Sequence, residues 1–99
     1  MTKTYCVYIL TNVHNDVFYI GSTSDLQKRI YEHKKKMFDG FSKKYNTNKL
    51  VYYEICADAD YMVLRERQLK NWHRDWKINL IKDKNPDFKD LYDELFPKC

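Results

Sequence analysis

The 99-residue sequence has few of the residues that break or link regular structure: two glycines, two prolines and no serine-rich stretch. It also contains no internal repeat. Without a linker or a low-complexity segment, we expect a single domain over residues 1–99, because so short a chain cannot enclose a second core. Hydrophobic residues make up 43% of the chain and aromatic residues 16%, so enough apolar surface is present for a compact fold.

Long apolar runs and a leader segment are missing as well. The first residues, Met1–Thr4, lack the apolar stretch and the small-residue cleavage site of a signal peptide. The longest apolar runs are far shorter than a membrane span. We therefore predict a soluble, cytoplasmic protein without a membrane partner.

Cysteine is scarce, and its spacing excludes two classes of site. Cys6, Cys56 and Cys99 are odd in number and far apart, which fits neither a disulfide framework nor a zinc knuckle. Cys6 and Cys56 fall within apolar runs, and we interpret them as small buried strand residues.

Positive charge is present but concentrated in one segment. The chain has 18 Lys/Arg and 14 Asp/Glu, a net charge of +4. Residues 28–49 hold eight of the basic residues against Glu32 and Asp39, a local charge of +6. Such a segment suits a polyanion, although a solvated helix face is the plainer interpretation of the same run. The candidate phosphate contacts are Lys34, Lys35, Lys36, Lys43 and Lys44.

Three apolar runs predict strands. Tyr5–Leu10 and Val17–Gly21 are rich in β-branched and aromatic residues, and the polar residues between them indicate a hairpin. A third strand is expected over Leu50–Cys56.

A first helix is predicted between the second and third strands. Ser24 and Gln27 match a capping box, which places the helix at about Asp25–Phe38. Its apolar stripe is Leu26, Ile30, His33 and Met37.

Two further helices are expected after the third strand. Asp58 can cap a long helix from Ala59 to about Lys82, and a short final helix is predicted over about residues 87–96. The apolar stripe of the long helix is Met62, Leu69, Trp72, Trp76 and Leu80. The element order predicts an α+β fold, a three-stranded antiparallel sheet flanked by helices, with its core in residues 5–82.

One carboxylate lies near the apolar stripe of the long helix. At 100° per residue, Glu66 falls within about 40° of the centre of that stripe. An isolated buried charge is costly, so a cation or a metal ion should neutralise it. An ion pair with Arg65 or with a partner on a strand is the structural alternative.

Other candidate residues lie on the first helix and the hairpin. Arg29 and His33 are four residues apart, so both should reach the same edge of the sheet. Taken alone, Arg29 could be a surface charge, and His33 could be a core histidine with its hydrogen bonds satisfied. Tyr8 and Tyr19 are ordinary core aromatics when taken alone. Gly21 ends a strand, which indicates a close approach of backbone or ligand.

In combination and in this order, these residues resemble the GIY-YIG nuclease superfamily, and most of all its small single-domain bacterial members. The resemblance rests on Val7-Tyr8-Ile9, on Tyr19-Ile20-Gly21, and on the stretches YIGSTSDLQKRIYEHK and RERQLKNWHRDWKINLI. It covers about Tyr5–Ile81, nearly the whole expected core.

The resemblance implies a role for each matching position. Tyr8, Tyr19, Arg29 and His33 correspond to catalytic positions, Gly21 to the small residue of the second motif, and Glu66 to the ligand of one Mg²⁺ or Mn²⁺ ion. The first motif, Cys6-Val7-Tyr8, lacks the family's glycine. The family's downstream asparagine has only Asn71 and Asn79 as candidate matches.

The function implied by the resemblance is metal-dependent endonucleolytic hydrolysis of nucleic acid, with DNA favoured over RNA and DNA repair as the setting. If Tyr8 acts as a base, it needs a lowered pKa, which we expect nearby cations to supply. A nucleic-acid-binding module with little or no turnover is one alternative. Another is an interaction protein that recruits a partner through its acidic tail, Asp87, Asp90, Asp93 and Glu94.

Overall fold

A computed structural model describes residues 3–36, 40 and 44–97. Its elements are β1 (Tyr5–Thr11), β2 (Phe18–Thr23), α1 (Leu26–Lys34), β3 (Lys49–Cys56), α3 (Ala59–Asn71), α4 (Arg74–Lys84) and α5 (Tyr92–Leu95). The strands form one antiparallel sheet in the order β2-β1-β3. This confirms the expected α+β fold, and the strand bounds agree with the sequence prediction within about two residues.

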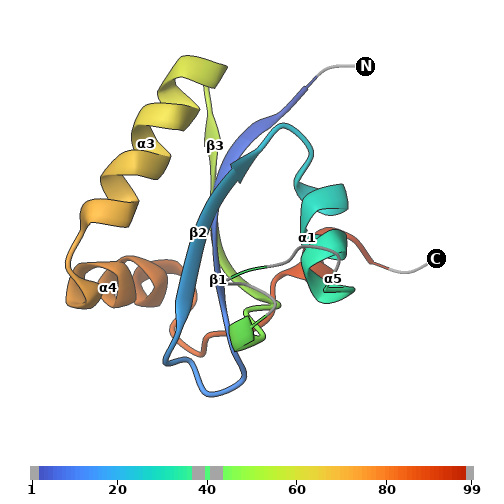
Figure 1. Cartoon of the computed structure of the whole chain (residues 1–99), viewed down its shortest axis with the longest axis vertical. Helices are drawn as coiled ribbons and strands as arrows, with labels where there is room; N and C mark the ends of the chain where they lie inside the picture. Colours follow the sequence, from blue (N-terminus) through green and yellow to red (C-terminus); the bar gives the residue numbers. More distant parts are fainter. Residues whose placement is uncertain (1–2, 37–39, 41–43, 98–99) are drawn as a thin grey trace.

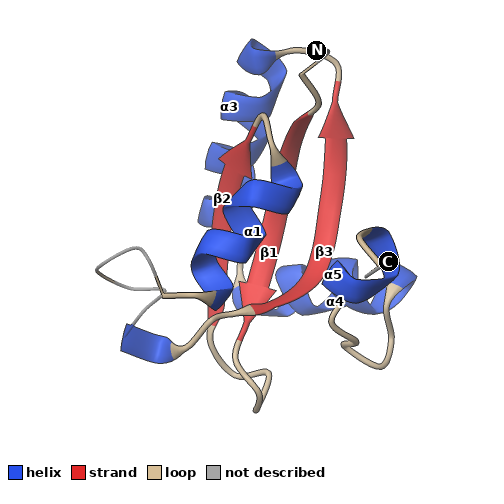
Figure 2. Ribbon diagram, turned by 90° about the vertical axis from the view of Figure 1, so that its right-hand side faces the viewer, coloured by secondary structure: helices blue, strands red, loops and turns tan. Residues whose placement is uncertain are grey.

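Helices cover both faces of the sheet. Figure 1 shows α3 and α4 on one side and α1 and α5 on the other. Figure 2 looks onto the second side, where α1 lies across β1 and β2. Because successive strand residues point to opposite faces, β1 supplies both layers of the core. Val7 and Ile9 pack on the α3/α4 side, whereas Tyr8 and Leu10 pack with Ile30 of α1.

The first helix begins one residue later than the capping box predicts. Asp25, rather than Ser24, is the N-cap, and its carboxylate accepts a hydrogen bond from the main-chain nitrogen of Lys28 at 3.2 Å. The hydroxyl of Thr23 accepts from the nitrogen of Asp25 at 2.9 Å, which favours this start. The helix ends at Lys34, and the expected stripe residue Met37 lies outside the described residues.

The long helix predicted over Ala59–Lys82 is wrong, because the chain forms two helices. Asp58 does cap α3, but the chain becomes extended at Trp72 and His73 before α4 begins. A straight helix of roughly 24 residues would be about 36 Å long, whereas an eight-residue strand spans only about 26 Å. The break lets α4 turn across the end of the sheet (Figure 1). It also leaves Trp76, expected in the apolar stripe, 55% exposed.

The final helix is shorter than predicted, Tyr92–Leu95 instead of residues 87–96. Phe88 packs against the α3/α4 side of the core, whereas Leu91 packs against the α1 side. The segment therefore passes around the β3 edge, where the nitrogen of Leu91 donates to the main-chain oxygen of Leu50 at 2.7 Å. A continuous helix could not place side chains on both faces of the sheet.

Cys6 and Cys56 are buried free thiols, as the sequence predicts, and burial raises the pKa of each. Cys99 lies outside the described residues. Across residues 3–36, 40 and 44–97, no helix has the length and apolar character needed to cross a membrane.

Candidate active site

The centre of the candidate site is the pairing of Tyr8 on β1 with Gly21 on β2. The Tyr8 side chain is fully buried, and its phenol ring lies directly over Gly21. A methyl group on Gly21 would overlap the hydroxyl oxygen and come within 2.5 Å of Cζ of Tyr8. The glycine thus provides room for the tyrosine, a close approach within the chain itself.

Tyr8, Tyr19 and His33 form an aromatic group beside this pairing. The Tyr8 hydroxyl lies 3.1 Å from Nε2 of His33, at hydrogen-bonding distance. The ring centroids are 5.9 Å apart for Tyr8 and His33, 5.1 Å for Tyr19 and His33, and 6.4 Å for the two tyrosines. Residues from β1, β2 and α1 therefore meet at one place.

The protonation states in this group differ from the sequence expectation. Burial raises the pKa of Tyr8, and the neighbouring Tyr19 adds to the rise, while Arg29 opposes it without cancelling it. The expectation that cations lower the pKa of Tyr8 is therefore wrong, because desolvation outweighs them. Burial, with help from Arg29, lowers the pKa of His33 to about 4. Both side chains are neutral at pH 7.

Arg29 lies at the outer rim of the aromatic group. Its Nε is 3.7 Å from Oε1 of Glu32, one turn along α1, and its side chain is 41% exposed. Its charge affects the pKa of both Tyr8 and His33. The guanidinium is thus close to the buried pair and partly exposed to solvent.

Glu66 on α3 is half-buried, with partners other than those expected. Its Oε1 accepts a hydrogen bond from the Ser22 hydroxyl at 2.5 Å, and its Oε2 lies 2.8 Å from Nζ of Lys70. Arg65, the ion-pair partner considered from the sequence, instead binds Glu54 at 2.8 Å. Burial opposes ionisation of Glu66, but the hydrogen bonds from Lys70 and Ser22 outweigh it and the pKa is lowered.

The helices that carry Arg29 and Glu66 lie on opposite faces of the sheet (Figure 1). Both side chains nevertheless act on Tyr8, because the Glu66 carboxylate raises the pKa of Tyr8 whereas Arg29 lowers it. β2 is an edge strand, so side chains from both faces can approach each other around it. Glu66 therefore influences Tyr8 electrostatically from the other face of the sheet.

The donors around Glu66 fit a hard divalent cation. In the described part of the chain no group of three or more His, Cys, Asp or Glu side chains is close enough to hold a metal ion. Mg²⁺ keeps several waters and commonly takes one or two carboxylates, so one ionised glutamate beside a hydroxyl is a sufficient anchor. The Lys70 ammonium already lies at Oε2, but it is 55% exposed and has room to move aside.

One of the candidate phosphate-binding lysines, Lys34, has partners within the fold. Lys34 binds Asp90 and donates to the main-chain oxygen of Asn48 at 2.9 Å, so it holds the C-terminal segment against α1. Lys35, Lys36 and Lys44 are exposed, and Lys43 lies outside the described residues. Asp90, considered from the sequence as part of an acidic tail that recruits a partner, is the residue that Lys34 binds, so it too has a partner within the fold.

Ser22 and Lys70 were not identified from the sequence as neighbours of Glu66. Lys70 is four residues beyond Glu66 on the same helix, a spacing that favours an ion pair and could have identified it. The contact of Ser22 with Glu66 depends on how α3 packs against β2, and no local sequence pattern predicts that packing. Asn71 and Asn79, the candidates for the family's asparagine, are both exposed.

Comparison with known proteins identifies the family and supports the fold. The model of the GIY-YIG catalytic domain matches residues 4–79. A UPF0213 protein of Syntrophus aciditrophicus (strain SB) is 34% identical over 88 residues, which cover 88% of this chain and 98% of the relative. The solution structure of a UPF0213 protein from Bacillus halodurans is similar to this chain, with a TM-score of 0.56 and 21% identity. The match covers 91% of this chain and 95% of that one, and it supports the fold. Because the matched domain spans most of the sequence, this chain is a small member of the GIY-YIG family, a nuclease-type family.

Proposed function

We propose that this protein is a metal-dependent endonuclease that hydrolyses phosphodiester bonds, with DNA as its substrate. The observation that supports the proposal is a hydrogen-bonded Tyr8–His33 pair beside Arg29, with Glu66 near enough to influence Tyr8 from the other face of the sheet. Phosphodiester hydrolysis needs an oriented water and positive charge on the phosphoryl oxygens. These side chains supply the groups for both tasks.

Glu66 would hold a Mg²⁺ or Mn²⁺ ion, with the Ser22 hydroxyl as a neighbouring oxygen donor. The bound ion supplies Lewis acidity toward the scissile phosphate. Arg29 would stabilise the charge that grows on the phosphoryl oxygens, because its planar fork of donors matches a phosphate better than the point charge of a lysine.

The neutral Tyr8–His33 pair suits proton transfer from the attacking water. The Tyr8 hydroxyl would accept a proton from water while it passes its own proton to Nε2 of His33, leaving an imidazolium and a neutral phenol. This relay does not need an ionised tyrosine, in agreement with the raised pKa of Tyr8. Tyr19, in ring contact with both partners, would keep their orientation.

Glu66→Gln tests the proposal directly, because it keeps the size of the side chain and removes the charge. We expect the purified protein to cut DNA when Mg²⁺ or Mn²⁺ is added, and the variant to lose at least about a hundredfold in rate. Glu94→Gln, the same change at an exposed position in α5, is the matched control and should leave the rate unchanged.

Substrates should include single-stranded, nicked, branched and duplex DNA, with RNA as a comparison. Binding without cleavage on every substrate would identify the chain as a nucleic-acid-binding module. Equal cleavage by the wild-type protein and Glu66→Gln would contradict the role assigned to Glu66.

A further inference from the structure

A groove runs beside β2 on the α3/α4 side of the sheet. It consists of two adjoining hollows that share Phe18 and Lys77. One hollow extends to Tyr45 and Arg74, and the other ends at Tyr19 and Lys70. We call this the β2 groove and define it by Phe18, Tyr19, Tyr45, Lys70, Arg74 and Lys77. Because Lys70 binds Glu66, one end of the groove lies at the candidate active site.

Cations line the β2 groove without a matching set of anions. In the part of the chain that the structure describes, Arg74 and Lys77 form no ion pair with a carboxylate. Arg74 instead donates to the main-chain oxygen of Asp16 at 2.6 Å and lies over the Phe18 ring. Lys77 is within 3.5 Å of the oxygen of Lys70. The Asp16 carboxylate, at the far end of the groove, accepts a hydrogen bond from Asn12 at 2.6 Å.

Keeping these cations so close together has an electrostatic cost. Burial lowers the pKa of Lys77, and the charge of Arg74 lowers it further. An anion in the groove would relieve this repulsion. The sequence prediction overlooked this surface, because Arg74 and Lys77 lie outside the basic segment of residues 28–49.

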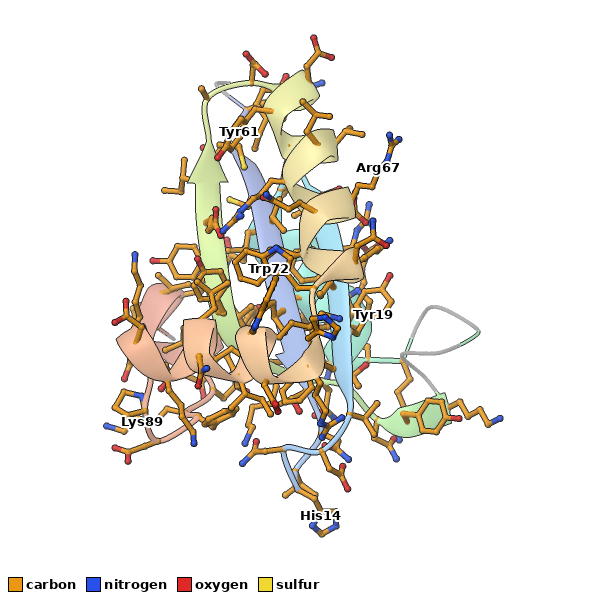
Figure 3. All side chains as sticks on the ribbon, turned by 90° about the vertical axis from the view of Figure 1, so that its left-hand side faces the viewer. His14, Tyr19, Tyr61, Arg67, Trp72 and Lys89 are labelled. Atoms are coloured by element: carbon orange, nitrogen blue, oxygen red, sulfur yellow. The ribbon has the colours of Figure 1, made fainter. Side chains whose placement is uncertain are left out.

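Aromatic residues lie among the cations that line the groove. Tyr45 is 41% exposed at the far end, with the ammonium of Lys44 over its ring at 5.4 Å. Phe18 lies in the middle and Tyr19 at the end near Glu66. Figure 3 views this side of the molecule and shows Tyr19 beside the edge of β2, with Trp72 between α3 and α4. Aromatic platforms among basic residues are typical of surfaces that bind single-stranded nucleic acid.

We propose that the β2 groove binds a single-stranded segment of nucleic acid and leads it to the site at Glu66. Arg74 and Lys77 contact its phosphates, and Tyr45 stacks on a base. The inference deepens the proposed function, on which it rests for the assignment of the site at Glu66. Binding in the groove is nevertheless measurable without cleavage.

The test measures binding of a labelled single-stranded oligonucleotide by fluorescence anisotropy in EDTA, over a range of salt concentrations. Arg74→Gln/Lys77→Gln should weaken binding about tenfold at physiological salt and flatten the salt dependence by about 1.4 units of slope, the value for two phosphate contacts on a single strand. Lys82→Gln/Lys84→Gln makes the same charge change elsewhere on α4 and should have a much smaller effect.

Further variants separate lost contacts from lost structure. Arg74 also holds the β1–β2 turn, so Lys77→Gln is tested alone, and Lys77→Arg should keep both the affinity and the slope. Tyr45→Ala should weaken single-strand binding, whereas Tyr45→Phe should not. Lys35→Gln/Lys36→Gln should change the affinity less than the groove variants, because neither lysine lines the groove.

Equal losses of single-strand affinity in the groove variants and in Lys82→Gln/Lys84→Gln would overturn the inference. Tighter binding to a duplex than to a single strand of the same length would overturn it as well. If the wild-type protein binds single strands through Arg74 and Lys77 but cuts none of the substrates with Mg²⁺ or Mn²⁺, the proposed function fails and the groove stands as a binding site. If cleavage is lost in Glu66→Gln while the groove variants bind normally, the groove assignment fails alone.

Discussion

The Tyr8 hydroxyl and Nε2 of His33 lie 3.1 Å apart in the interior, with His33 only 5% exposed. The imidazole can accept the phenol's proton only while it is neutral, because an imidazolium carries a hydrogen on both ring nitrogens. Burial and the charge of Arg29 keep it neutral at pH 7 by lowering its pKa to about 4. The same features make the fold sensitive to acid.

The first prediction concerns this acid sensitivity. Well above pH 6.5, His33 is neutral in both the folded and the unfolded chain and adds no pH dependence. As the pH falls from about 6.5 to 4, the unfolded chain takes up a proton that the folded chain does not, so the free energy of unfolding decreases by about 3 kcal/mol in all. Urea unfolding at a series of pH values would measure this decrease.

His33→Gln should remove most of this slope, because glutamine does not titrate. His14→Gln, the same change at an exposed position in the β1–β2 turn, should leave the slope as it is in the wild-type protein. An unchanged slope in His33→Gln would show that other groups cause the acid sensitivity.

The second prediction concerns the space that Gly21 leaves for Tyr8. Gly21→Ala adds a methyl group that overlaps the phenol ring, and neither the strand nor the buried ring can move away easily. We expect the free energy of unfolding to fall by about 1–3 kcal/mol, the usual cost of overpacking a core. Ser24→Ala, a similarly small change just beyond the end of β2, is the control. A stability for Gly21→Ala equal to that of the wild-type protein would mean that Tyr8 does not need this space.

The central sheet was predictable from the sequence because its pattern is local. Apolar runs rich in β-branched and aromatic residues identify β1 and β3, and the polar turn before Phe18 identifies the hairpin. The bounds of the helices were less predictable. Residues 59–82 carry a helical pattern throughout, and only the limited length of the sheet requires the break at Trp72.

The candidate site was only partly predictable for a similar reason. Tyr8, Arg29 and His33 follow from their motifs and spacing. The partners of Glu66 depend on how α3 packs against the edge of β2, which places Ser22 at 2.5 Å. The pKa of Tyr8 depends on complete burial, a tertiary property that outweighs nearby charges.

The last prediction concerns competition between Lys70 and a metal ion for Glu66. The ammonium lies 2.8 Å from Oε2 of Glu66, so a divalent cation bound at that oxygen must displace it. Lys70→Gln removes the competing charge and should tighten the binding of Mn²⁺, measured by calorimetry or electron paramagnetic resonance. Because Lys70 is 55% exposed, its ion pair is worth at most about 1 kcal/mol, and the gain should not exceed about fivefold.

Lys70→Arg keeps the charge and should leave the Mn²⁺ affinity close to that of the wild-type protein. Glu66→Gln should abolish Mn²⁺ binding in both the wild-type protein and Lys70→Gln, which links the measured ion to this carboxylate. The cleavage rate of Lys70→Gln at saturating Mn²⁺ should still fall if Lys70 contacts the nucleic acid at the end of the β2 groove. Weaker Mn²⁺ binding by Lys70→Gln than by the wild-type protein would contradict competition and indicate that Lys70 instead holds Glu66 in position for the ion.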